Sequence, residues 1–113
     1  MARTSRNLMQ FVTVASGSVV SDQAEFGRLA QGGLFVPAAI DKEIFVQASW
    51  DTTSANFARV QLRSGSGDWS IASRTTALAQ TFEAAAIPFE HFRVELGAAS
   101  TDTRTFCFVA KFR

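Results

Sequence analysis

Residues 92–96, Phe92-Arg93-Val94-Glu95-Leu96, alternate apolar and polar side chains at every position. This period of two is typical of a strand with one face on a core and the other in water. The same alternation runs through residues 44–50, 59–63 and 105–113, and weaker strand patterns cover residues 9–15, 34–36 and 69–73. Turn-forming residues separate these runs at intervals of roughly 10 to 15 residues. The pattern predicts an all-β protein, a single antiparallel β-sandwich or jelly roll.

The chain is long enough for one domain of ordinary size. It has 113 residues, of which 47% are hydrophobic and 19% charged, so it can bury a core. No linker, repeat or low-complexity tract divides residues 1–113. We therefore expect a single domain, with the polar residues 1–7 as an N-terminal arm.

Two stretches are ambiguous between helix and strand. Asp22 and Glu25 resemble a capping box, but alternation around Ala24 and Phe26 favours a strand near residues 22–29. The alanine-rich stretch 77–86 stops before Pro88, as a helix would. We expect at most one short helical turn, near residues 80–87.

The charge balance and the scarcity of His and Cys exclude several functions. A formal net charge of +1 argues against nucleic-acid binding, which normally needs a strongly basic face. No apolar run reaches the roughly 18 residues of a membrane-spanning helix. One His and one Cys cannot build a zinc cluster or a disulfide framework. We expect no cofactor and no metal, and Asp41, Glu43 and Asp51 lack the dense loop of a calcium site.

No residue pattern predicts an enzyme. His91 is the only candidate base. It shares the odd-numbered, polar face of the predicted strand with Arg93 and Glu95, which predicts an exposed histidine at a strand edge. Cys107 lies mid-strand and is expected to be a small buried hydrophobe. The glycine-rich stretch 64–68 lacks the lysine of a phosphate-binding loop and predicts a hairpin turn. We expect no catalytic residues.

Arginines on the predicted polar faces are the candidate binding residues. Arg59, Arg63 and Arg93 could simply be solvated and protect the strands from aggregation. They could instead bind carboxylates of a partner protein in bidentate fashion. The arm adds Arg3 and Arg6, which a neighbouring subunit would have to order.

The aromatic residues allow a second kind of surface. Eleven Phe in a chain of this length leave room for an exposed apolar patch that a partner covers. The pairs Trp50-Asp51 and Asp68-Trp69 could form a carbohydrate platform, although tryptophan on a strand is more often part of the core.

Three segments resemble a family of small tailed-phage proteins. They are Ser21-Asp22-Gln23-Ala24-Glu25-Phe26-Gly27, Gly33-Leu34-Phe35-Val36-Pro37-Ala38-Ala39-Ile40 and Ile44-Phe45-Val46-Gln47-Ala48-Ser49-Trp50-Asp51. The family pattern continues through an Asp-containing turn to an Arg-x-aromatic strand, here Arg104-Thr105-Phe106. This sequence departs from the pattern at Ile40, where the family usually has Trp, and in a shorter middle segment.

The resemblance implies a structural virion component, with a β-sandwich or jelly-roll fold and no active site. It favours a capsid cement (decoration) protein, made in the host cytoplasm and placed on the capsid exterior. Its partners would be the major capsid protein and further copies of itself, most simply as a homotrimer at a lattice axis. The alternative is a head-fibre, tail-fibre or neck module that binds host carbohydrate or another virion protein.

Overall fold

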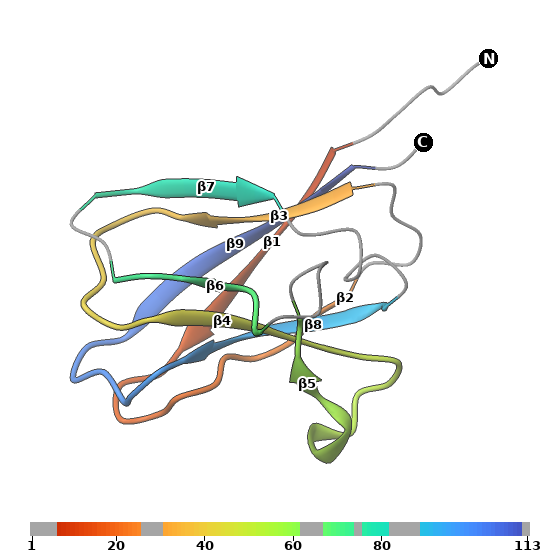
Figure 1. Ribbon diagram of the computed structural model, residues 1–113, viewed down its shortest axis with the longest axis horizontal. Coiled ribbons are helices and arrows are strands. Elements are labelled where there is room, and N and C mark those ends of the chain that lie inside the picture. Colours follow the sequence, from red (N-terminus) through yellow and green to blue (C-terminus); the bar gives the residue numbers. More distant parts are fainter. Residues whose placement is uncertain (1–6, 26–30, 62–66, 74–75, 82–88, 112–113) are drawn as a thin grey trace.

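The computed structural model describes residues 7–25, 31–61, 67–73, 76–81 and 89–111 (Figure 1). The strands are β1 (Asn7–Val14), β2 (Ala24–Glu25), β3 (Gln31–Val36), β4 (Ile44–Ser49), β5 (Ala58–Arg59), β6 (Ser70–Ile71), β7 (Leu78–Thr81), β8 (His91–Leu96) and β9 (Arg104–Lys111). A single 3-10 turn, η1 (Ser54–Asn56), lies between β4 and β5. No helix in these ranges is long and apolar enough to cross a membrane.

The strands form two antiparallel sheets that face each other. The first sheet has the order β1-β9-β3-β7, and the second has the order β2-β8-β4-β5, with β6 also paired to β4. Figure 1 shows β3, β7 and β9 in one layer and β4, β6 and β8 in the other. Most consecutive strands belong to opposite sheets, which is the connectivity of a jelly roll. The sandwich prediction is confirmed.

The two-residue alternation explains which side chains meet between the sheets. Phe92, Val94 and Leu96 of β8 are at most 1% exposed, as are Phe106 and Phe108 of β9. The rings of Phe92 and Phe108 lie 6.0 Å apart, one from each sheet. The other fully buried large side chains are Trp69, Leu34, Ile44, Val12, Val14, Val36 and Val46.

Polar groups connect the two sheets along the edge where β1 meets β2. The Gln10 side chain accepts a hydrogen bond from the backbone N–H of Glu25 at 2.9 Å and donates one to its carbonyl oxygen. The backbone N–H of Thr13 donates to Asp22 Oδ1 at 2.7 Å. These contacts satisfy both backbone groups of Glu25 in β2 and the N–H of Thr13 in β1, which would otherwise lie at open sheet edges.

Several local predictions can be compared with the structure. Residues 9–15 contain most of β1, residues 34–36 contain part of β3, and residues 69–73 contain β6. The expected strand at 22–29 is described only as β2, because residues 26–30 lie outside the described ranges. The helical turn expected at 80–87 is wrong at Gln80 and Thr81, which belong to β7, and residues 82–88 are not described. Around the glycine-rich loop, Gln61 and Asp68 pair in antiparallel fashion, as in a hairpin.

Two predictions of exposure are wrong. His91 and Arg93 do lie on the outer face of β8, yet only 8% and 9% of their surfaces are exposed. The loop after β4 covers this part of the sheet, with Ser54 and Phe57 contacting the Arg93 guanidinium. Alternation thus predicted the correct face, but a loop from another part of the sequence excludes water from it.

Candidate interaction surfaces

The outer face of the four-stranded sheet carries a patch of apolar side chains. Met9 and Phe11 of β1 are 61% and 63% exposed, and Phe35 of β3 and Val109 of β9 are 40% and 36% exposed. We call these four residues the apolar face. They alternate along their strands with Val12, Leu34 and Phe108, which enter the core.

The strand register brings the apolar face together as two adjacent rows. In the first row, Met9 pairs with Val109. In the second row, two residues further along the strands, Phe11 and Phe35 both pair with Cys107, which lies between them. Directly opposed side chains on neighbouring strands lie about 4.5–5.5 Å apart, so each row is continuous. Contiguous exposed apolar patches on a soluble protein mark interaction sites.

Cys107 is the small residue at the centre of this face. It is only 1% exposed although it points outward, because large side chains stand on both sides of it. Burial raises the pKa of its thiol, so the neutral form is favoured. The prediction of a buried, hydrophobic cysteine is confirmed.

Beyond Phe11 and Phe35, the apolar face has uncharged neighbours. Thr13 and Thr105 pair with each other beyond Phe11, and Ala79 pairs with Phe35 on β7. All three are exposed. In the opposite direction, beyond Met9 and Val109, the next position of the same parity on β9 is Lys111, which pairs with Asn7 and Gln31. A partner could therefore bury the two rows without removing a charged group from water if its contact ends before Lys111.

The outer face of the five-stranded sheet is different, because ion pairs within the chain occupy it. Arg59 binds Glu95 in bidentate fashion, with Nε 2.9 Å from Oε1 and Nη2 2.7 Å from Oε2. Its Nη1 donates to Asp68 Oδ2 at 2.9 Å. The hydrogen bonds from Arg59 hold the pKa of both carboxyl groups below their ordinary values, and they raise the pKa of Arg59.

A second arginine is bound beside this group. Arg93 donates to the Gln47 side chain and, at 3.0 Å, to the Ser54 hydroxyl. Its guanidinium lies 4.4 Å from the centre of the Phe57 ring, and that of Arg59 lies 3.8 Å from the centre of the Phe45 ring. Burial lowers the pKa of Arg93.

These contacts bear on the arginines expected to bind a partner. Arg59 keeps 37% of its side chain exposed, but three of its N–H groups already bind carboxylates in the chain. Arg93 is buried, as described above. Arg3, Arg6 and Arg63 lie outside the described residues. Partner binding by these arginines stays a prediction, and the structure brings only Arg59 and Arg93 onto one face.

The two tryptophans have opposite environments. Trp69 is 2% exposed and belongs to the core, so it is not available to a ligand, whereas Trp50 is 67% exposed at the end of β4. The neighbouring Asp51 carboxylate accepts hydrogen bonds from the Asn56 side chain at 3.1 and 3.0 Å and from the Thr53 backbone at 3.1 Å. These bonds, the Asn56 bond first, lower the pKa of Asp51.

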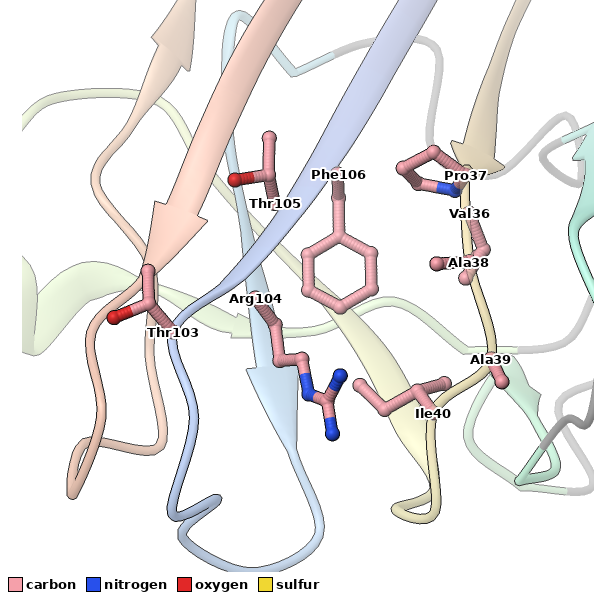
Figure 2. Close-up of a pocket in the computed structure, with 9 residues that line it drawn as sticks. All are labelled: Val36, Pro37, Ala38, Ala39, Ile40, Thr103, Arg104, Thr105 and Phe106. Carbon is pink, nitrogen blue, oxygen red and sulfur yellow. The ribbon is translucent and has the colours of Figure 1, made fainter.

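A small cavity lies at the end of the sandwich where β3 leaves its sheet (Figure 2). Its volume is about 170 Å³, and it lies between the connection from β3 to β4 and the beginning of β9. The lining residues are Val36, Pro37, Ala38, Ala39, Ile40, Thr103, Arg104, Thr105 and Phe106. Pockets for small-molecule ligands usually measure about 300–1,000 Å³. This cavity is better suited to water, which could satisfy the buried Nε of Arg104 that has no hydrogen-bond partner among the described residues.

Sequence reasoning missed the apolar face as a defined site. The signal was present, because β1 and β9 carry large apolar side chains at both odd and even positions. A strand with one face in water needs apolar residues only at every second position, where the side chains face the core. The register that joins Phe11, Cys107 and Phe35 into one row came from the structure.

Comparison with known proteins supports the fold and leaves the family open. The sequence matches no protein-family model and no curated protein. The crystal structure of YomS, a protein derived from the SPBc2 prophage, is similar with a TM-score of 0.60 and 12% identity, over 98% of this chain and 97% of that one. A structure of Bacillus endospore appendages, described as disulfide-linked pili, is similar with a TM-score of 0.50 and 14% identity, over 96% of this chain and 86% of that one. At such identities the similarity is one of fold.

Proposed function

We propose that this chain is a structural component of a tailed-phage virion, a cement protein that lies on the capsid exterior. In this role the apolar face packs on the major capsid protein. The five-stranded sheet then faces solvent. No cofactor, nucleic acid, membrane or catalytic step takes part.

The observation that carries the proposal is the difference between the two outer faces. One presents Met9, Phe11, Phe35 and Val109 to water without a charged neighbour in the paired rows. The other holds its charges in ion pairs inside the chain. A molecule that lies on a larger surface needs one face of each kind, because it must bury apolar area on one side and stay soluble on the other.

The sequence resemblance and the fold comparison support the same class of protein. The segments that resemble small tailed-phage proteins include β2, most of β3 and β4. A prophage-derived protein shares the fold over nearly the whole of both chains. In the phage-like segment of β4, Phe45, Gln47 and Ser49 are structural: they contact Arg59, Glu95 and Asp51 within the chain.

The proposal includes assembly with further copies, as a homotrimer at a symmetry axis of the lattice. Such an axis repeats one contact between neighbouring copies and thereby multiplies weak binding to the lattice. The protein would be made in the host cytoplasm and join the particle there.

The copy number of the chain in purified particles tests the proposal. Quantitative mass spectrometry would compare this chain with the major capsid protein in the same sample. A ratio close to a simple fraction of the capsid subunits is the expected result. Absence from the particle would overturn the virion role.

A fibre or neck module is the second candidate function, and the exposure of Trp50 favours it. Its indole is 67% exposed beside an ordered turn, as in a carbohydrate platform. A few copies per particle in the same measurement would support this candidate and contradict the cement role.

A further inference from the structure

The only histidine lies against two glutamates at the corner where β2 meets β8. Glu25 of β2 pairs directly with His91, the first residue of β8, and Glu90 precedes it. One ligand atom from each of the three residues lies within 4.8 Å of those of the other two. The cluster belongs to the five-stranded sheet, whereas the apolar face belongs to the four-stranded sheet.

We propose that Glu25, Glu90 and His91 form a binding site for a divalent transition-metal ion, of which Zn²⁺ suits the donors best. This site differs from the calcium site considered at Asp41, Glu43 and Asp51. It also departs from the expectation of a protein without metal, which rested on the absence of a zinc motif in the sequence.

The imidazole of His91 provides the first argument. His91 is 8% exposed, and its nearest acidic groups are the two glutamates of the cluster and the Asp51 carboxylate, which interacts with it electrostatically. The glutamate oxygens are close to the ring yet are not bonded to it. An ion between the three groups would satisfy them all at once.

The spacing of the donors provides the second argument. Bonds from Zn²⁺ to nitrogen or oxygen ligands measure about 2.0–2.2 Å, so two ligands of a tetrahedral ion lie roughly 3.4 Å apart. Atoms within 4.8 Å of one another reach this separation by small rotations of the two glutamates, both of which are exposed. The backbone need not move.

The chemistry of the donors selects the class of ion. An imidazole nitrogen with two carboxylate oxygens suits zinc and its neighbours in the first transition series. Calcium and magnesium prefer oxygen ligands only, and calcium takes six to eight of them. Three protein ligands leave a fourth tetrahedral position open to water or to a side chain of a partner.

Neighbouring residues hold two of the three ligands in place. Gln10 bonds both backbone groups of Glu25, which fixes β2 beside β8. On its other side His91 pairs with Ser49 of β4. The Ser49 hydroxyl is bonded to Asp51, since it accepts a hydrogen bond from the N–H of Asp51 at 3.1 Å and donates one to Asp51 Oδ1 at 3.3 Å.

Zinc titration of the full chain by isothermal calorimetry, with Zn²⁺ alone as the probe, tests the site. We expect one zinc ion per chain and a higher melting temperature with zinc. Excess Ca²⁺ or Mg²⁺ should neither displace the zinc nor remove this stabilisation. Co²⁺ should bind in the same place and give a visible spectrum with the intensity of a four-coordinate site. Absence of stoichiometric binding by the wild type would overturn the proposal.

Substitutions distinguish this site from weak binding elsewhere. Glu25→Gln, an exposed position whose change should not disturb folding, and His91→Gln should each weaken zinc binding by at least about tenfold. Asp41→Asn, an exposed acid remote from the cluster in the sequence, is the matched control and should bind zinc like the wild type. Unchanged binding in Glu25→Gln, or equal loss in the control, would contradict the assignment even if His91→Gln fails to fold.

Discussion

At the scale of single residues, the Arg59 guanidinium shows how this protein uses charge. The N–H groups of this planar guanidinium donate to Glu95 on one side and to Asp68 on another, and its flat face lies over the Phe45 ring. Such bidentate pairs are the strong class of charge-assisted hydrogen bonds. Arg59 therefore acts first as a connector, which joins β5 to β8 and to the residue before Trp69.

The ion pair predicts an acid-dependent loss of stability. The pKa of Glu95 in the folded chain is below its ordinary value, so its contribution is complete above the unfolded pKa of about 4.3 and disappears as the pH falls through the folded pKa. Glu95→Gln should lower the free energy of unfolding at pH 7 by about 1 kcal/mol, since the exposure of Arg59 weakens the pair. Urea unfolding at several pH values measures the difference, which should shrink below about pH 4.

The control for this prediction is Glu43→Gln. Glu43 is exposed, and the described part of the chain offers it no ion pair. The variant should differ little from the wild type at any pH. A difference for Glu95→Gln that stays constant down to pH 2–3 would show that packing, and not charge, sets its effect.

The residue scale also shows where sequence reasoning stopped. Alternation correctly assigned His91, Arg93 and Glu95 to one face of β8, because side-chain direction is a local property of the strand. It could not predict that His91 and Arg93 are buried, since the loop that includes Ser54 and Phe57 arrives from almost 40 residues away in the sequence. The cluster of Glu25 with His91 was hidden for the same reason.

At the scale of elements, β8 and β9 form the centre of the sandwich. Each lies between two neighbours in its own sheet, and their inward rings meet at Phe92 and Phe108. Their patterns were the clearest in the sequence, and both were predicted with nearly correct bounds. Short strands such as β2 and β5 could not be predicted, because a stretch of two residues shows no periodicity and its pairing is set by the neighbouring strands.

The central position of β8 makes Phe92 a sensitive test of the packing between the sheets. Phe92→Ala should lower the free energy of unfolding by about 3–5 kcal/mol, because Phe92 is 0% exposed and its loss leaves a cavity. Phe11→Ala removes the same atoms from a side chain that is 63% exposed, and it should cost less than about 1 kcal/mol. Denaturant unfolding of both purified variants measures this. Similar losses would contradict the assignment of Phe11 to an outer surface.

At the scale of the whole molecule, the two sheets present different surfaces to their surroundings. Inside the sandwich they share one core, and outside it one face is apolar while the other is polar and charged. The patterns of the individual strands predicted the core. The difference between the outer faces depends on register, which aligns Phe11, Cys107 and Phe35 across three strands that are distant in the sequence.

If the apolar face is the docking surface, its removal should release the protein from particles without unfolding it. The double variant Phe11→Ser and Phe35→Ser changes two exposed side chains of one row, so the core should stay intact. Burying a whole Phe side chain is worth about 1.5–3 kcal/mol, of which the exposed part is available to a partner. We therefore expect at least about tenfold weaker retention on purified capsids, measured by co-sedimentation, with loss of the particle's heat resistance.

Trp50→Ser is the matched control for this experiment, because it removes an exposed aromatic side chain from outside the apolar face. It should remain on the capsid like the wild type, and thermal melting of both free proteins would show that they are folded. If the double variant stays bound while Trp50→Ser is released, the partner must meet the end of β4. The cement role proposed for the apolar face would then be contradicted, and a fibre or neck module that binds through Trp50 would be the better supported function.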